Sequence, residues 1–420
     1  MTRTQALVLT ATLVACSGDD DGTDLDLDLG ADLGGGDQGV DAGVDQGVDM
    51  GVGDPLTLTL LHMSDHASEL LPDTLALDTS SLTLAAPADF DGGPITEVSL
   101  SYGGMPAFAA AFAARRAAAT NPVAIHAGDA IPGTPYFDAF RGEADAAMMN
   151  AICFDAFALG DREFAEGDGA LATFLDFLAA DAGCETAVLA ANVRPGSRSA
   201  LATGYLEPST VLMVEGQEVG VVGLLKASTR DTSAPDADTQ FADEATTAQE
   251  TIDALTDAGV TKIVLVTHQG YDADLALAAS LRGVDVIVGG DSGTLLGTVG
   301  TEGLGLDADA SYPTEVTDAD GDPVCVVHAW ERTRVFGELV VAFDGAGRVT
   351  SCTGRVNVPV PDDLEMSYAF DTGEGLTDRV LDATDRATVV TALEALPGVL
   401  SVTPDAEAAA ALDDFTARLE

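Results

Sequence analysis

Two carboxylates stand where apolar segments of the chain end, between residues 122 and 167. The run VAIHAG leads to Asp129 and the run FDAFALG leads to Asp161, with a Gly/Pro-rich loop and a helical pattern between them. Apolar runs of this length predict buried strands. In open α/β sheets ligands bind beyond the carboxyl ends of such strands, so these residues predict a site at one sheet edge.

Three further apolar segments deliver a polar side chain at their ends. The segment PLTLTLLHMS leads to Asp65, KIVLVTH ends at His268, and VDVIVGG leads to Asp291. Helical patterns such as GDGALATFLDFLAADAG and ATTAQETIDALTDAG lie between the apolar segments. Strands that alternate with helices predict a layered α/β fold.

The stretch 122–167 resembles the 5′-nucleotidase branch of the calcineurin-like metallophosphoesterases, although Asp161-Arg162 replaces the Asn-His pair of that branch. The matching positions are Gly128, Asp129, Gly133, Thr134, Gly160, Glu163 and Phe164. The resemblance covers roughly residues 55–360, which correspond to the N-terminal catalytic domain of the family. It implies a calcineurin-like four-layer sandwich, with two mixed β-sheets flanked by helices.

The resemblance also implies a centre that binds divalent metal ions and hydrolyses phosphate esters. Two ligand histidines of the family are replaced by Ala67 and Gly293. The donors that remain are Asp65, Asp129, Asp161, His268 and Asp291. Four carboxylates and one imidazole favour Mg²⁺, Mn²⁺ or Ca²⁺ over Zn²⁺. We therefore expect one divalent cation, or none if the centre is degenerate. The cation would be held by Asp129, Asp161, His268 and Asp291.

Arg162 stands where relatives have the histidine that assists the departing oxygen. Two interpretations stay open: its guanidinium binds the phosphate of a substrate beside one metal, or it forms a salt bridge with Asp65 and Asp129 so that no metal is needed. The first predicts a 5′-nucleotidase-type metallophosphoesterase that acts on small, nucleotide-like phosphate esters. The second predicts a non-catalytic binding or scaffold protein at the cell surface.

Four histidines lie outside this set, and the sequence predicts the environment of three of them. His66 directly follows Asp65, and because neighbouring residues point in different directions we expect it at the surface. His126 resembles a histidine of close relatives, and His328 alternates with apolar neighbours. Both are expected to be structural.

The charge of the chain limits its partners. The 420 residues include 18 Lys+Arg and 70 Asp+Glu, a formal net charge of −52, and only two lysines, Lys226 and Lys262. Nucleic-acid phosphates repel such a chain, which excludes nucleic-acid binding through a basic surface. Hydrophobic residues make up 46%, enough for the core of one large or two modest domains. No pattern indicates an oligomer.

The N-terminus is expected to be a targeting segment. Arg3, an apolar run and Leu13-Val14-Ala15-Cys16 fit a lipoprotein signal peptide over residues 1–16, with Cys16 as the lipidated residue. An ordinary secretory peptide is the alternative. The protein is thus expected to be exported and held in the bacterial cell envelope through its lipid alone.

The rest of the chain divides by composition. Residues 17–54 repeat D-x-G-V and carry too much charge and glycine to fold, so they predict an extended acidic linker. Residues 55–360 would form the metallophosphoesterase-like domain, and residues 361–420 a C-terminal helical tail.

Four cysteines remain if Cys16 carries lipid, and an even number in an exported chain favours disulfides. Cys153 and Cys184 each precede a predicted strand, so their thiols meet if those strands are parallel neighbours. Cys325 and Cys352 flank a predicted antiparallel meander. We predict the pairs Cys153–Cys184 and Cys325–Cys352, with four buried free thiols as the alternative.

Overall fold

Two mixed β-sheets face each other in the computed structural model, which describes residues 53–420 apart from 82–88, 91–92, 95–96, 298–303, 363–365 and 372–375. The expected signal peptide, its Cys16 and all but the last two residues of the expected linker lie outside the described residues. None of the helices in the described part is long and apolar enough to cross a membrane.

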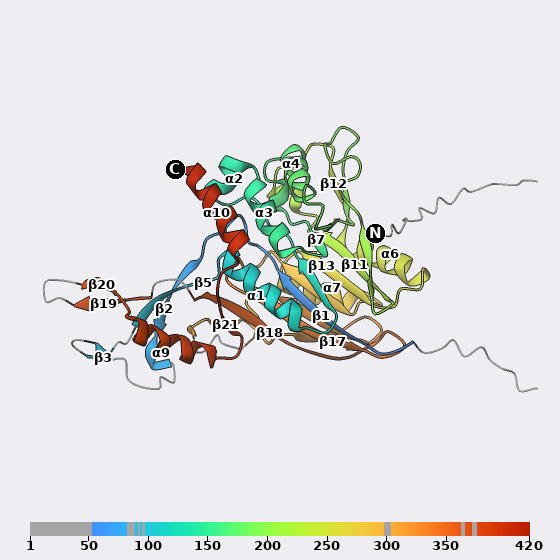
Figure 1. Ribbon diagram of the computed structural model, residues 1–420. Coiled ribbons are helices and arrows are strands. Elements are labelled where there is room, and N and C mark those ends of the chain that lie inside the picture. Colours follow the sequence, from blue (N-terminus) through green and yellow to red (C-terminus); the bar gives the residue numbers. More distant parts are fainter. Residues whose placement is uncertain are drawn as a thin grey trace, which may run out of the picture. The chain divides into compact units, whose positions relative to one another are not determined.

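The first sheet has seven strands in the order β21-β18-β17-β1-β6-β7-β8. Figure 1 labels β21, β18, β17, β1 and β7 of this sheet. β1 pairs in parallel with β6 and antiparallel with β17, so the sheet is mixed. The strands are β1 (Leu56–Met63), β6 (Pro122–His126), β7 (Ala156–Ala158), β8 (Ala187–Leu189), β17 (Phe336–Phe343), β18 (Val349–Pro361) and β21 (Val399–Val402).

The second sheet has six strands in the order β10-β11-β13-β14-β16-β15. Its four inner strands are parallel, and the two edge strands are antiparallel to their neighbours. The strands are β10 (Ser209–Val214), β11 (Gln217–Leu225), β13 (Ile263–His268), β14 (Val286–Gly290), β15 (Thr314–Thr317) and β16 (Pro323–His328).

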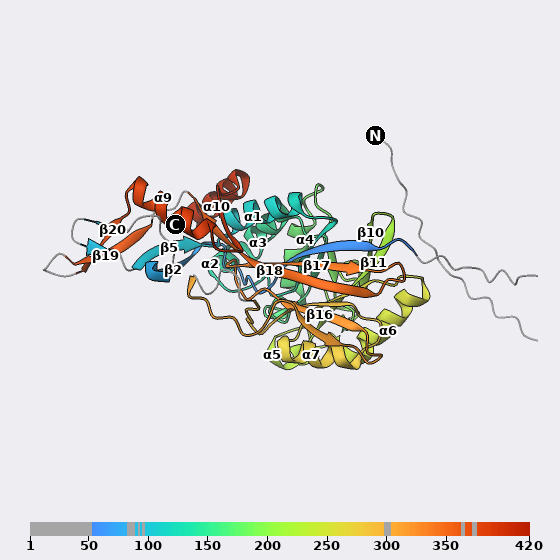
Figure 2. The ribbon, with the colours of Figure 1, turned by 90° about the horizontal axis from the view of Figure 1, so that it is seen from below.

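Helices cover the outer face of each sheet (Figure 2). On the first sheet lie α1 (Met105–Ala118), α2 (Pro135–Phe140), α3 (Glu143–Ile152), α4 (Asp168–Leu178) and α10 (Ala406–Leu419). On the second lie α6 (Glu244–Asp257) and α7 (Tyr271–Ser280). The alanine-rich α1 docks through Phe112, whose ring is 5.2 Å from that of Phe336 on β17.

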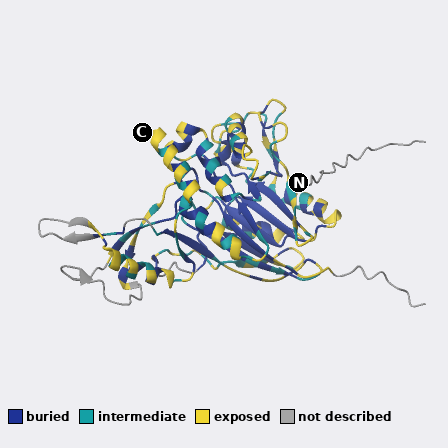
Figure 3. Cartoon of the chain, viewed as in Figure 1, coloured by how far each residue is buried: buried dark blue, intermediate teal, exposed yellow. Residues whose placement is uncertain are grey.

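A continuous apolar core fills the space between the two sheets. Side chains such as Leu58 of β1 and Val264 of β13 belong to it and are fully buried. The strands accordingly appear dark blue in Figure 3, whereas exposed residues gather on the helices and loops. Helix, sheet, sheet and helix give the four layers, which confirms the fold class expected from the sequence.

Smaller elements complete the described chain. A four-stranded sheet has the order β2-β5-β19-β20, and α9 packs near β21. These elements are β2 (Asp73–Asp78), β5 (Glu97–Tyr102), β19 (Ser367–Asp371), β20 (Leu376–Val380) and α9 (Ala383–Glu394). The remaining short elements are η1 (Thr79–Ser81), η2 (Arg162–Phe164), α5 (Thr229–Thr232) and the strands β3 (Asp89–Phe90), β4 (Gly93–Pro94), β9 (Val193–Arg194) and β12 (Gln240–Phe241).

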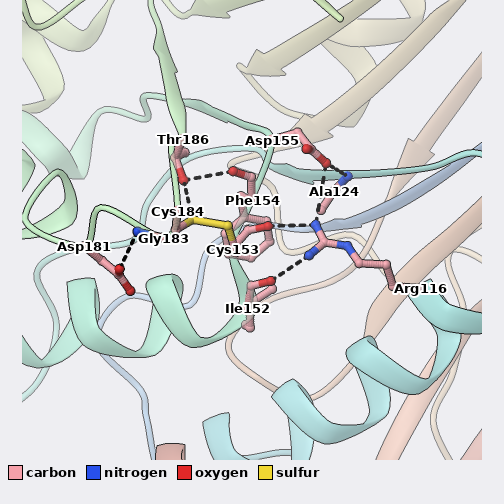
Figure 4. The surroundings of a disulfide bond; sticks show 10 residues. All are labelled: Arg116, Ala124, Ile152, Cys153, Phe154, Asp155, Asp181, Gly183, Cys184 and Thr186. Carbon is pink, nitrogen blue, oxygen red and sulfur yellow. Dashed lines mark hydrogen bonds and ion pairs between the residues drawn. A yellow bond between two sulfur atoms is a disulfide. The ribbon is translucent and has the colours of Figure 1, made fainter. Parts of the chain in front are cut away.

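Two disulfides join the cysteines in the pairs that the sequence predicts. Cys153 follows α3 and bonds to Cys184 ahead of β8, with the two Cα atoms 5.4 Å apart (Figure 4). Arg116 of α1 donates to the carbonyl of Cys153 at 2.7 Å, which ties this bridge to the helix layer.

The second disulfide forms as predicted, but its cysteines do not flank an antiparallel meander. Cys325 lies on β16 and Cys352 on β18, with Cα atoms 6.4 Å apart. β16 pairs with β14 and β15, whereas β18 pairs with β17 and β21. The bond therefore crosses from one sheet to the other. The two cysteines do not flank one antiparallel ribbon, because the segment after β16 leaves the second sheet.

Candidate functional site

The five predicted metal-binding residues converge at the ends of strands from both sheets. β1, β6 and β7 lead to Asp65, Asp129 and Asp161, whereas β13 ends at His268 and β14 leads to Asp291. Two groups of three residues each bring one donor atom per residue within 4.8 Å of the others. The first group is Asp65, Asp129 and His268, and the second is Asp161, His268 and Asp291. The structure thus forms two adjoining donor groups that share one imidazole.

His268 lies at the centre of this cluster and is fully buried. Its Nδ1 is 2.7 Å from the carbonyl of Ala127, which fixes the ring and leaves Nε2 facing the carboxylates. Nε2 is 3.2 Å from Asp129 Oδ1, 3.7 Å from Asp65 Oδ1 and 3.9 Å from the Oδ1 atoms of Asp161 and Asp291. The contact with Asp129 is the shortest of the four, and all of them are contacts to carboxylate oxygens.

The carboxylates and the imidazole shift one another's protonation. Burial lowers the pKa of His268, but the charges of Asp129 and Asp65 outweigh burial and hold this pKa well above its ordinary value. Burial raises the pKa of Asp65 to about 6, against the opposing charge of His268. Burial also acts against ionisation of Asp129, but His268 outweighs it and keeps the pKa of Asp129 below its usual value.

Glu163 holds the two loops that present Asp129 and Asp161. One of its oxygens accepts from the backbone N–H groups of Ala130 and Ile131 at 2.6 and 3.2 Å, and the other from those of Gly160 and Asp129 at 2.6 and 3.0 Å. The side chain is 1% exposed. Sequence reasoning matched Glu163 to the family motif but gave it no role.

The loops approach each other so closely that one position requires glycine. A Cβ atom at Gly160 would lie at 2.6 Å from the backbone nitrogen of Asp129 and collide with its carboxylate. Asp65, Asp129 and Asp291 themselves have positive φ angles of 55°, 56° and 83°. Non-glycine residues adopt this region rarely, and such strain tends to gather at functional sites.

Lys226 is the residue of the cluster that sequence reasoning missed. It follows β11, and its Nζ lies 2.5 Å from Asp291 Oδ1 and 3.2 Å from Asp161 Oδ1. Burial opposes its charge, but Asp291 and Asp161 keep the pKa of Lys226 above its ordinary value. Its position after an apolar strand, like that of the predicted ligands, and the rarity of lysine in this chain were the available signals.

Arg162 contacts Asp129 but does not fill the cluster. Its Nε is 3.3 Å from Asp129 Oδ2, and its backbone N–H donates to Asp129 Oδ1 at 2.9 Å. The side chain is 55% exposed. A salt bridge to Asp129 is therefore present, and Arg162 also lines the cavity that opens onto the cluster.

A cavity of about 310 Å³ opens onto the cluster. It is lined by Asp65, Ala67, Glu69, Asp129, Gly133, Asp161, Arg162, Asp291, Gly293, Glu331 and Arg332. Both positions where the family has ligand histidines, Ala67 and Gly293, are thus on its wall. The guanidinium groups of Arg162 and Arg332 are the positive charges of this lining.

His66 is not at the surface, which corrects the expectation from the sequence. It is fully buried, with Nδ1 2.9 Å from Nε2 of His126 and Nε2 3.4 Å from Asp145. His126 is also buried, and His328 is buried with its Nε2 2.8 Å from Asp274. These three histidines pack beneath or beside the cluster and do not enter its donor groups.

The two donor groups differ in how well they fit a metal ion. Asp65, Asp129 and Nε2 of His268 offer two carboxylates and an imidazole at a buried position, which suits a divalent cation. Asp161 and Asp291 offer oxygens that the ammonium of Lys226 already contacts. The first group fits a divalent ion as it stands, which departs from the sequence expectation of an ion held by Asp129, Asp161, His268 and Asp291.

No family model matches the chain. The chain is 33% identical over 359 residues to a probable 5′-nucleotidase of Treponema pallidum. The aligned segment covers 85% of this chain and 56% of that protein. Among solved structures it resembles the NAD nucleotidase of Haemophilus influenzae, with a TM-score of 0.76, 30% identity, and coverage of 87% of this chain and 68% of that one.

A second solved structure, a 5′-nucleotidase precursor from Thermus thermophilus, matches with a TM-score of 0.67 and 33% identity over 87% of this chain and 59% of that one. The chain spans about half the length of the curated relatives it matches.

Proposed function

Because this chain belongs to the 5′-nucleotidase family of calcineurin-like metallophosphoesterases, we propose that it hydrolyses small, nucleotide-like phosphate esters at one divalent cation. The cation would be held within the set Asp65, Asp129, Asp161, His268 and Asp291. The observation that carries the proposal is the buried Nε2 of His268, which lies 3.2–3.9 Å from one oxygen of each of four carboxylates.

The donor set supports Mg²⁺, Mn²⁺ or Ca²⁺ rather than Zn²⁺, because carboxylate oxygens dominate it. When bound, such an ion polarises a phosphoryl oxygen and lowers the pKa of a bound water. Asp65, Asp129 and His268 would hold the ion, and the carbonyl of Ala127 orients the imidazole. Glu163 keeps the backbone of Asp129 in place through its hydrogen bonds to the loop.

Arg162 and Arg332 would bind the phosphate of the substrate at the mouth of the cavity. A guanidinium cannot serve as a general acid near neutral pH, because it does not give up its proton there. The contribution of about 10²- to 10⁴-fold that a general acid makes is therefore absent at position 162. We expect turnover to be slow.

Release of inorganic phosphate from a nucleoside 5′-monophosphate in the presence of Mn²⁺ tests the proposal. Wild-type protein should release phosphate, and a chelator or Asp129→Asn should stop the release. Asp272→Asn serves as a control, because Asp272 is exposed on α7 and lies outside the cavity lining. Release no faster than that of Asp129→Asn would instead support the non-catalytic binding or scaffold protein.

We also propose a domain organisation and a cellular location for the protein. Residues 1–16 would be the signal peptide, Cys16 the lipid anchor, 17–54 a tether and 55–360 the catalytic domain. Residues 361–420 complete the first sheet of that domain through β21 and its helix layer through α10. Two disulfides support an oxidising compartment outside the cytoplasm. Wild-type protein should partition into detergent from cell extracts, whereas Cys16→Ala should stay in the aqueous phase.

A further inference from the structure

Hydrogen bonds fix the backbone of Lys226, which directly follows β11. Its backbone N–H donates to the carbonyl of His268 at 3.1 Å. Its carbonyl accepts from the backbone N–H and the hydroxyl of Thr229 at 3.0 and 2.6 Å. The side chain is only 18% exposed, so it extends into the cluster and not into solvent.

The second donor group consists of Asp161, His268 and Asp291. The ammonium of Lys226 contacts the two carboxylate oxygens that a metal ion in this group would need as ligands. Nζ is 2.5 Å from Asp291 Oδ1 and 3.2 Å from Asp161 Oδ1. These same two oxygens lie 3.9 Å from Nε2 of His268. The other oxygen of Asp161 accepts from the hydroxyl of Thr232 at 2.8 Å. A divalent ion bound at about 2.0–2.6 Å from both Oδ1 atoms would collide with the ammonium and be repelled by its charge.

The group formed by Asp65, Asp129 and His268 lacks such an obstacle in the part of the chain that the structure describes. The Oδ1 atoms of Asp129 and Asp65 lie 3.2 and 3.7 Å from Nε2 of His268. The guanidinium of Arg162 approaches the opposite oxygen of Asp129 from a half-exposed side chain. An ion can therefore enter this group by displacing only the proton that His268 carries, whereas the ammonium of Lys226 stays in place.

We propose that the ammonium of Lys226 takes the place of a second metal ion. The cluster then holds one exchangeable divalent cation, at Asp65, Asp129 and His268, and one permanent cation between Asp161 and Asp291. The exchangeable ion rests on the proposed function, whereas the ammonium is part of the chain. An ammonium neutralises charge and donates hydrogen bonds, but unlike a metal ion it does not activate a bound water.

Titration with Mn²⁺ alone tests this inference, with calorimetry for the number of ions and electron paramagnetic resonance for their coupling. Wild-type protein should bind one ion per chain. Lys226→Met keeps the length of the side chain but removes the charge, and should bind two. The coupling expected of ions about 3.5–4 Å apart should appear only in this variant. Lys226→Arg is the matched control, because it retains a positive charge and should bind one.

Two ions in the wild-type protein, or the same number of ions in the wild-type protein and a folded Lys226→Met, would overturn the inference. If Lys226→Met does not fold, the wild-type count still decides: one ion up to millimolar Mn²⁺ supports the inference and two reject it. No ion in the wild-type protein and one in Lys226→Met would uphold the role of Lys226 and refute the metal-dependent function. One ion without phosphate release would refute only the function.

Discussion

Nε2 of His268 lies 3.2 Å from Oδ1 of Asp129, although the two residues reach this point from different sheets. His268 is the last residue of β13, and Asp129 follows β6. Their contact joins the two donor groups into one cluster, because the same nitrogen also faces Asp161 and Asp291. Changes at this contact should therefore affect ion binding more strongly than changes elsewhere on the cavity wall.

Asp129→Asn should abolish Mn²⁺ binding. The amide removes the negative charge nearest to Nε2 of His268 and leaves only one carboxylate in the group that fits an ion. Calorimetric titration should show a loss of at least about 10²-fold in affinity, on the order of 3 kcal/mol. Asp272→Asn should bind as the wild type does. Unchanged affinity in Asp129→Asn would place the ion elsewhere.

Glu163→Gln should destabilise the folded protein by about 1–3 kcal/mol, because a Gln amide turns one N–H₂ group toward backbone N–H donors and leaves them unsatisfied. Urea unfolding followed by circular dichroism measures this change. Glu166→Gln is the control, since Glu166 is half-exposed and pairs only with Arg141 at 2.9 Å within the described structure. Its unfolding free energy should change by less than about 0.5 kcal/mol. Equal values for the two variants would contradict the loop-holding role of Glu163.

The contribution of Asp285 to the stability of the protein should fall as the pH rises from about 4 to about 8. Burial raises the pKa of Asp285 to about 8, despite a hydrogen bond from the Ile263 backbone and the charge of Lys262. The folded chain thus keeps a proton that the unfolded chain loses near pH 4, so this contribution is full below pH 4 and is lost as pH rises through 8.

Asp285→Asn should remove this part of the pH dependence, because the amide oxygen can still accept from Ile263 and carries no charge at any pH. Urea unfolding at pH 5, 6.5 and 8 should show a shallower decline for the variant than for the wild type. Parallel declines would mean that Asp285 is ionised in the folded protein throughout this range.

Loss of the Cys153–Cys184 bridge should lower the unfolding free energy by about 3–4 kcal/mol in the chain-entropy account, since it closes a loop of 31 residues. The double variant Cys153→Ala/Cys184→Ala, unfolded in urea, measures this effect. Peptide mapping of the native protein without reductant should recover both linked pairs. Four alkylatable thiols would show that the bridges do not form.

Much of the site could be predicted because it depends on where strands end. Apolar runs give the strands, and the residue after each run lands at the sheet edge, as Asp129 and Asp161 do. Glu163 and Lys226 were harder to assign, because their roles depend on distances between loops. Glu163 accepts hydrogen bonds from four backbone groups, and Nζ of Lys226 contacts carboxylates that follow two other strands. A local sequence pattern predicts neither arrangement.

The error at His66 has a specific cause in the backbone. The expectation of a surface position assumed that neighbouring residues alternate, which holds only while the chain is extended. Asp65, Ala67 and Ser68 have φ angles of 55°, 48° and 58°, so the segment turns sharply and carries His66 inward to His126. Sequence patterns do not reveal left-handed residues other than glycine reliably, and three of them stand here.

The Cys325–Cys352 bond and the cluster both span the same two sheets. Asp65, Asp129 and Asp161 come from the part of the chain before β8, and Lys226, His268 and Asp291 from the part after β10. Neither part alone supplies a complete donor group, so an ion can bind only after the sheets have packed. Ion binding would then be one of the last events in folding, and a chain cut between β9 and β10 would bind Mn²⁺ only once its two fragments had reassociated.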